Sequence, residues 1–202
     1  MKQTLGKDRQ PQHRTSTLNE KALHAALKDW YAKPGDRFEQ LVDRYLVDIV
    51  RGSLLVEVQT SNFSAIKRKL ARLVEHHRLR LVYPVPVERH IVRLDADHRT
   101  RLGRRKSPKR GRLDEVFAEL VYIPFLLDHP NFSLEVVLTH EEQERCHHPG
   151  RAWRRNGWVN QERKLLTVVG THVFETLADY VAFIPDATPE PFTTADLAKV
   201  LD

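Results

Sequence analysis

The spacing of apolar residues changes along the chain and predicts helices and strands in alternation. Apolar positions at helical intervals predict a first helix over about 18–31, opened by a capping box between Thr17 and Glu20. Similar spacing over 36–45 predicts a second helix capped by Asp36. The chain therefore begins, by pattern, with two helices separated by a Pro-Gly turn.

Beyond Tyr45 the pattern becomes that of strands. YLVDIV and SLLVEVQT flank Arg51-Gly52 and predict a hairpin over 45–60. A basic helix follows at about 64–77, and apolar runs predict two strands at 79–85 and 87–94. Strand, helix and strand at this spacing form a βαβ crossover, which makes the flanking strands parallel. The predicted fold class is therefore α/β, with a mixed β-sheet and a smaller basic α+β segment.

The remaining chain contains shorter signals. We expect a helix over 113–122, strands over 132–139 and 165–169, a hairpin turn at Asn156-Gly157 and a helix over 176–184. Thr193 is a candidate N-cap for a last helix. The predicted organisation is a disordered arm at 1–15, an α/β core at 16–96, a basic loop at 97–112, an α+β extension at 113–190 and the start of a further unit at 191–202.

Composition narrows the class of protein. The chain has 202 residues, a single cysteine and 41% hydrophobic residues, which suits a globular protein without internal disulfides. No apolar run approaches the roughly 20 residues of a membrane-spanning helix. The polar N-terminus lacks the apolar region of a signal peptide. We therefore expect a cytoplasmic protein.

Positive charge is concentrated in two places. The net charge is +6 and the pI about 9.5, and residues 99–112 carry eight basic side chains and no acidic one. A second cluster interleaves arginines with two tryptophans at 151–158. Such surfaces attract polyanions, and aromatic rings can stack on bases; a solvated charged loop is the alternative. The predicted DNA contacts are Arg99, Arg101, Arg104, Arg105, Lys106, Lys109, Arg110, Arg112, Trp153, Arg154, Arg155 and Trp158.

The candidate chemistry lies in the predicted hairpin. With a turn at Arg51-Gly52 and side chains alternating in direction, Asp48 and Glu57 become diagonal neighbours roughly 7–8 Å apart. One face is then formed by Asp48, Leu55, Glu57 and Gln59, and the other by Val47, Ile49, Leu54, Val56 and Val58. Two carboxylates placed together repel, and a divalent cation relieves that repulsion; Mg²⁺ or Mn²⁺ is the expected ion. A solvated polar face would show the same alternation.

This arrangement resembles the core of the PD-(D/E)xK nuclease superfamily over roughly residues 36–85. The resemblance implies that Asp48 and Glu57 bind Mg²⁺, with Glu39 as a helical acid that joins them. It places Gln59 where Lys usually stands, so Lys67 or Lys69 on the next helix would assist the water or the phosphate, and Gln59 would orient the water. The usual core has three strands before that helix, whereas only two are predicted here.

Other motifs in the sequence give weaker indications of function. The segment TTADLA resembles the opening of a winged-helix unit, and the overall layout is similar to that of an uncharacterised bacterial family. Cys146-His147-His148 has poor spacing for zinc, and a solvated face is predicted for Glu141, Glu142 and Glu144. The sequence thus favours Mg²⁺-dependent DNA hydrolysis, with a non-catalytic DNA-binding or regulatory protein as the alternative.

Overall fold

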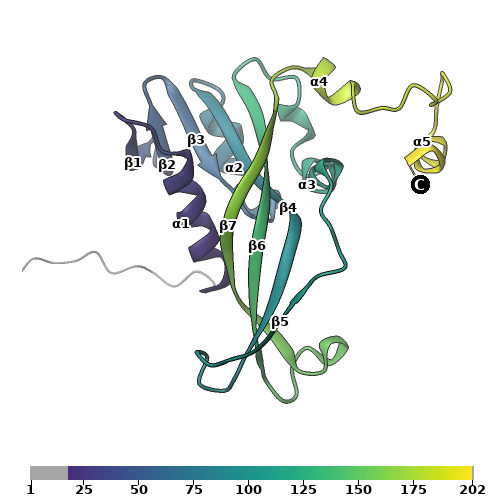
Figure 1. Ribbon diagram of the computed structural model, residues 1–202. Helices are drawn as coiled ribbons and strands as arrows, with labels where there is room; N and C mark the ends of the chain where they lie inside the picture. Colours follow the sequence, from purple (N-terminus) through teal and green to yellow (C-terminus); the bar gives the residue numbers. More distant parts are fainter. Residues whose placement is uncertain (1–17, 202) are drawn as a thin grey trace, which may run out of the picture.

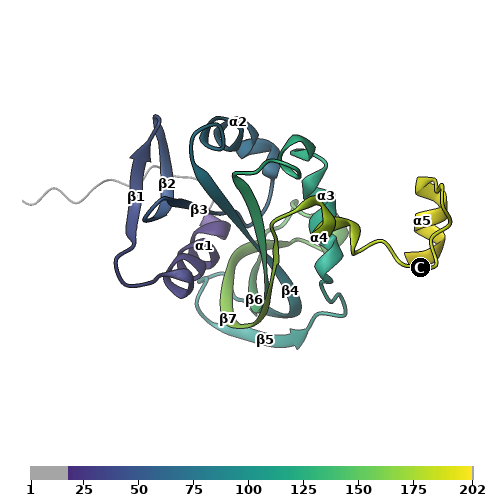
Figure 2. The same ribbon diagram turned by 90° about the horizontal axis from the view of Figure 1, so that it is seen from above.

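One mixed sheet of seven strands organises the protein, and helices cover both of its faces (Figures 1 and 2). The structure is a computed structural model that describes residues 18–201. The elements are α1 (Leu18–Tyr31), β1 (Arg37–Val42), β2 (Tyr45–Arg51), β3 (Leu54–Val58), α2 (Phe63–Leu73), β4 (Arg78–Leu94), β5 (Arg101–Lys106), the 3₁₀ helix η1 (Leu113–Val116), α3 (Phe117–Leu120), η2 (Pro124–Leu126), β6 (Phe132–His147), η3 (Trp153–Arg155), β7 (Trp158–Phe174), α4 (Leu177–Val181) and α5 (Thr194–Leu201). The predicted 1–15 arm and Thr17 lie outside this range.

The sheet order is β1-β2-β3-β4-β6-β7, and β5 also pairs with β4. Strands β1 to β3 form an antiparallel meander, whereas β3, β4 and β6 are parallel. The connection β3-α2-β4 is the predicted crossover, and the α/β fold class with a mixed sheet is confirmed. Helix α1 packs its apolar side chains on one face of the sheet and α2 packs on the other (Figure 2).

Residues 37–42 form strand β1 and residues 43–44 the turn into β2, so the second helix predicted over 36–45 is wrong. Asp36 does not cap a helix; its carboxylate accepts hydrogen bonds from the Arg51 Nε and Nη2 at 2.9 and 2.7 Å. Asp43 and Arg44 both have positive φ, which closes a tight turn between β1 and β2. Pairing with β2 supplies the backbone hydrogen bonds that a helix would have made, and the protein gains a third strand before α2.

Strand β4 is continuous where two strands were predicted, although it contains Pro84 and Pro86. Their ring nitrogens face one edge of β4, between the part that pairs with β3 (up to Val82) and the part that pairs with β5 (from His90). This follows from the bonds that flank them on that edge: Val82 accepts from Gln59 N–H and Pro86 accepts from the Gly111 N–H. Because no strand pairs with this edge of β4 at this point, the absence of a backbone N–H at the two prolines removes no hydrogen bond between strands. The register between β4 and β6 shifts at a bulge after Pro86.

The second half of β4 forms a four-stranded extension with β5, β6 and β7, which reaches beyond the end of α1 (Figure 1). The segment 97–112, predicted as a loop, contains strand β5, because β4 offers a free edge from His90 onward. The expected strands 132–139 and 165–169 are parts of the much longer β6 and β7. Asn156 and Gly157 both have positive φ, but they end a longer connection rather than a two-residue turn.

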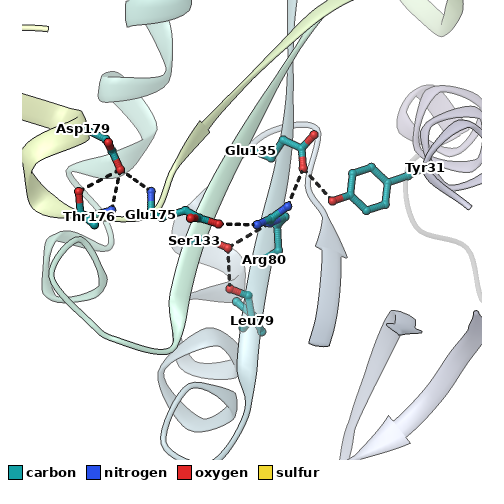
Figure 3. A network of polar contacts seen from close by, with 8 residues as sticks. All are labelled: Tyr31, Leu79, Arg80, Ser133, Glu135, Glu175, Thr176 and Asp179. Carbon is teal, nitrogen blue, oxygen red and sulfur yellow. Dashed lines mark hydrogen bonds and ion pairs between the residues drawn. The ribbon is translucent and has the colours of Figure 1, made fainter. Parts of the chain in front are cut away.

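A polar network fixes the C-terminal end of α1 to the sheet and to β7 (Figure 3). The Tyr31 hydroxyl donates to Glu135 at 2.7 Å, and Arg80 bridges Glu135 and Glu175 at 3.4 and 2.9 Å. At the other end of the chain, Thr193 accepts the Asp196 N–H, which confirms the predicted N-cap of α5. None of the helices between residues 18 and 201 combines the length and apolarity that crossing a bilayer requires.

Candidate functional site

Asp48 lies where strand β2 departs from regular pairing on both sides. The β1–β2 ladder pairs Phe38 with Ile49 and Gln40 with Val47, and omits the position between them. The β2–β3 ladder ends at Ile49. Glu39, the residue that would face Asp48 on β1, has a φ of 51°. Asp48 therefore has no register partner on β1 or β3, and side chains make contacts at this position in place of the ladder.

The hairpin turn comes one residue later than predicted and changes the partner of Asp48. Gly52 and Ser53 occupy the turn, with Gly52 at a φ of 57°, and Val50 pairs with Leu55. Continued by two residues, this register places Asp48 directly opposite Glu57, not diagonal to it. Directly opposite positions are the closest cross-strand pairs in an antiparallel sheet.

The Asp48 carboxylate is held by α1 and by the backbone of β3. Its Oδ2 accepts the Val58 N–H at 2.9 Å and lies 3.2 Å from the His24 Nε2, and Lys28 Nζ lies 3.8 Å from Oδ1. Burial raises the pKa of Asp48, but the hydrogen bond and charge of His24, with Val58 and Lys28, outweigh burial and leave the pKa lowered. Asp48 is therefore ionised at neutral pH.

Glu57 has a different environment, although the charge and the backbone N–H of Asp48 act on its carboxylate. It is 4% exposed, and its Oε1 forms an ion pair with Lys69 Nζ of α2 at 2.6 Å. Burial and the nearby Asp48 charge raise the pKa of Glu57 to about 7, against the lowering effect of Lys69 and of the Asp48 backbone N–H. We call Asp48 and Glu57 the acidic pair; its two members have pKa values shifted in opposite directions.

The predicted division of the hairpin into two faces is wrong at Asp48. Ile49, Val56 and Val58 do share the face under α1, but Val47 packs with Val50 in the cluster under α2. The irregular backbone at Asp48 breaks the two-residue alternation. As a result Asp48 takes its partners from α1, whereas Glu57 takes Lys69 from α2.

The structure separates the other predicted site residues. Lys69 contacts Glu57, whereas the Lys67 Nζ lies 5.5 Å over the Phe125 ring and away from the pair. The Gln59 side chain donates to the Ser61 carbonyl, so its amide N–H₂ supports the turn before α2. Glu39 lies on β1 instead of a helix, and Lys28 links it to Asp48, with Nζ 2.9 Å from the Glu39 Oε1.

The donor atoms of the acidic pair suit a hard divalent cation. Among residues 18–201 no three His, Cys, Asp or Glu side chains gather in a way that could hold a metal ion. An ion here would depend on two carboxylates, with water and phosphate oxygens completing its shell, which is the usual pattern for Mg²⁺. A cation would also relieve the repulsion that, with burial, raises the pKa of Glu57.

The predicted basic surface is partly neutralised within the protein. Arg101 and Arg104 of β5 pair with Glu142 at 3.0 and 2.8 Å. Lys106, Lys109 and Arg112 pair with Glu88, Glu115 and Asp114. No acidic partner occurs for Arg99, Arg105 or Arg110 within residues 18–201. Arg154 and Arg155 are exposed on η3, and the ring of Trp158 lies under the Arg93 guanidinium at 4.6 Å.

Buried acids on β6 are the feature that the sequence reading missed. Glu141, Glu142 and Glu144, predicted as a solvated face, are 0%, 5% and 8% exposed. Glu141 accepts two hydrogen bonds of 3.0 Å from Arg163. Complementary charge on the neighbouring strand, EEQE of β6 against ERK of β7, was the signal that could have revealed this pairing.

Fold and site together define a mixed α/β protein with a buried acidic pair and an arginine-rich sheet extension. The chain belongs to the family described as Domain of unknown function (DUF8091), which matches residues 21–175. It is similar to a Treponema pallidum (strain Nichols) protein described as "Uncharacterized protein", with 33% identity over 186 residues that cover 91% of this chain and 73% of the relative. No solved structure matches.

Proposed function

We propose that this protein is a nuclease that hydrolyses DNA with Mg²⁺ or Mn²⁺ bound at the acidic pair, and that it acts in the cytoplasm. The observation that carries the proposal is the coupling of Asp48, Glu57 and Lys69 at the break in the β2 ladders: the charge and backbone N–H of Asp48 act on the Glu57 carboxylate, and Lys69 pairs with it. The resemblance to the PD-(D/E)xK superfamily implies this set of residues. It has two acids on adjacent strands and, where Gln replaces the usual Lys, a lysine on the following helix.

The topology supports the same proposal. A helix, a three-stranded antiparallel meander, a crossover helix and a parallel strand precede the extension. The third strand, β1, removes the one departure in strand number between the predicted core and the usual core of that superfamily. Asp48 and Glu57 fall on the second and third strands, as the resemblance requires.

The residues around the acidic pair would have distinct roles. Asp48 is ionised and would contribute a permanent carboxylate ligand, whereas Glu57 would lose its proton on binding a cation. Lys69 holds the Glu57 carboxylate from α2 and also donates to the Leu46 carbonyl at 2.5 Å, which fixes its position. A bound divalent cation would polarise the scissile phosphate and lower the pKa of an attacking water.

A cleavage assay tests this proposal. Wild-type protein, Asp48→Asn and Glu57→Gln are incubated with labelled single-stranded and duplex DNA, with Mg²⁺, Mn²⁺ or EDTA. We expect metal-dependent cleavage by the wild type and its loss in both variants. Glu75→Gln, which removes an exposed acid at the end of α2, is the matched control and should cleave normally. Cleavage that persists in Asp48→Asn would contradict the proposal.

A non-catalytic DNA-binding protein is the second candidate, and one observation favours it. Each acid of the pair has a cationic neighbour within the protein, Lys28 for Asp48 and Lys69 for Glu57, and Asp48 also has a hydrogen-bond partner in His24. A pair neutralised in this way is stable without a metal ion. DNA binding that survives in Asp48→Asn, together with no cleavage by the wild type, would favour this function.

A further inference from the structure

The far end of the sheet, where β5, β4, β6 and β7 lie side by side beyond α1, carries arginines that the acidic pair does not use (Figure 1). On parallel strands β4 and β6, Arg93 and Arg145 are register partners. On β5, Arg105 pairs with Ile91, two residues before Arg93. Register partners share a face and neighbouring strands lie about 4.8 Å apart, so three guanidinium groups gather on one face. We call Arg93, Arg105 and Arg145 the arginine cluster.

Acids of the protein neutralise arginines on the opposite face of the same strands, and Glu141 neutralises Arg89 and Arg163 further along this face, but no acid pairs with the arginine cluster. Arg101 and Arg104, also on β5, are paired with Glu142. The arginine cluster has no acidic partner within residues 18–201. The only side-chain hydrogen bond found for Arg145 in that range is donated to Gln143, and its buried Nε has no partner. Burial, followed by the charges of Arg155, Arg105, Arg89 and Arg93, lowers the pKa of Arg145.

A cavity lies against this cluster. It has a volume of about 330 Å³ and is lined by Ile91, Arg93, Leu102, Gly103, Arg104, Arg105 and Trp158. Gly103 is the β5 partner of Arg93, and a Cβ added there would meet no atom within 4 Å. The absence of a side chain at this position leaves room beside the Arg93 guanidinium, which itself lies on the Trp158 ring at 4.6 Å. Space and positive charge therefore coincide at Arg93 and Arg105, and Arg145 adds its charge from the neighbouring strand.

We infer that the arginine cluster is a binding site for the phosphodiester backbone of a nucleic acid. Guanidinium groups bind phosphate oxygens through paired, charge-assisted hydrogen bonds, and an anion bound at Arg93 and Arg105 would offset the mutual repulsion of the cluster. The inference rests on the proposed function and adds to it a second contact point on the substrate. Glu57 pairs with Leu81 on β4, twelve residues before Arg93, so the two sites are at most roughly 40 Å apart along the strand.

The test measures DNA binding in EDTA, so that cleavage does not contribute. A fluorescent 20-mer, long enough to span both sites at about 3.4 Å per base pair, is titrated as single strand and as duplex over a salt series. Arg145→Gln and Arg93→Gln remove charge from the cluster. Arg101→Gln removes the same charge from the other face of the sheet, and Gly103→Val fills the cavity without changing charge.

We expect Arg145→Gln and Arg93→Gln each to weaken binding about tenfold and to reduce the slope of log affinity against log salt by about 1. Gly103→Val should also weaken binding, whereas Arg101→Gln should bind nearly as the wild type does. Arg93 is exposed, so its variant keeps the test valid if Arg145→Gln does not fold. Inorganic phosphate in a parallel thermal-shift arm separates a free-anion site from a nucleic-acid site.

Two results would overturn the inference. One is equal binding by Arg93→Gln, Arg145→Gln and Arg101→Gln, which would mean that only net charge matters. The other is stabilisation of the wild type by inorganic phosphate without any binding of the 20-mer. Neither result depends on cleavage: absence of metal-dependent cleavage by the wild type, with intact cluster-dependent binding, would refute the proposed nuclease and leave this site standing.

Discussion

The acidic pair and the arginine cluster are both groups of like charge, but the protein treats them differently. Asp48 and Glu57 have internal partners, the cations Lys28 and Lys69 and the hydrogen-bonding ring of His24. The arginine cluster has no internal anion within residues 18–201. The first arrangement is stable alone and a bound cation would compete with existing partners, whereas the second is left with repulsion that only an external anion can relieve. If both proposals hold, the arginine cluster is ready to bind an anion, whereas the acidic pair binds a cation only after that cation has displaced its internal partners.

The largest expected effect on stability comes from removing the buried acid that neutralises two arginines of the sheet extension. Glu141 is fully buried, with Arg163 at 3.0 Å and Arg89 at 3.5 Å. Glu141→Gln would leave two guanidinium groups without their shared anion, and we expect a loss of about 3–5 kcal/mol in the free energy of unfolding. Urea denaturation measures this loss. Glu75→Gln, at an exposed acid, should change stability by less than about 1 kcal/mol, and an equal loss in both variants would contradict the account.

Glu57 gives the next largest effect, and it depends on pH. Its pKa is about 7 in the folded protein against 4.5 for the free side chain, so the native state binds the proton more tightly than the unfolded state. Stability therefore falls as the pH rises from about 4.5 to above 7, by about 3 kcal/mol in total. Glu57→Gln should remove this slope. Denaturation at pH 5 and pH 8 compares the two proteins, and parallel curves would show that Glu57 titrates normally.

Lys69 and Lys67 offer a contrast on a single helix. Lys69→Met removes the cation that compensates Glu57, so the pKa of Glu57 should rise further and the stability at pH 8 should fall by about 1–3 kcal/mol. Lys67→Met removes only an exposed contact with the Phe125 ring, worth about 0.5–1 kcal/mol. Thermal denaturation at pH 8 distinguishes the two. Equal effects would mean that Lys69 is not coupled to the acidic pair.

The smallest expected effect has the opposite sign. Arg145→Gln removes one of several mutually repelling charges, so we expect stability without ligand to rise by about 0.5–1 kcal/mol at low salt. Screening at 1 M salt, where the Debye length is about 3 Å, should abolish the gain. Thermal unfolding at the two salt concentrations checks this prediction. A variant less stable than the wild type at low salt would show that Arg145 already has a stabilising partner.

The sequence predicts the elements that have strong local signals and fails where tertiary pairing decides. The hairpin, the crossover helix and the last N-cap follow from alternation, periodicity and capping chemistry. Residues 36–45 were predicted as a helix because Phe38 and Leu41 fit helical spacing, yet both are exposed on an edge strand. Pairing with β2 and the positive φ of Asp43 and Arg44 decide that segment, and neither is visible in the periodicity.

The candidate site was predictable in its residues but not in its geometry. Asp48, Glu57 and Lys69 follow from the motif and its spacing, whereas the choice of Lys69 over Lys67 depends on the rotation of α2 over the sheet. The one-residue shift of the turn to Gly52 and Ser53 changed the partner of Asp48. Burial of Glu141 depends on Arg163, 22 residues away on β7, a pairing that becomes visible only once β6 and β7 are known to be neighbours.

Binding of Mn²⁺ at pH 8, measured by electron paramagnetic resonance on the full chain, tests whether the acidic pair is a metal site. Wild-type protein and Glu75→Gln should each bind one ion, and Asp48→Asn and Glu57→Gln should each lose that binding. If Mn²⁺ binds to the wild type no more tightly than to Asp48→Asn, the acidic pair is a structural feature held by His24, Lys28 and Lys69, and the proposed metal-dependent nuclease is wrong.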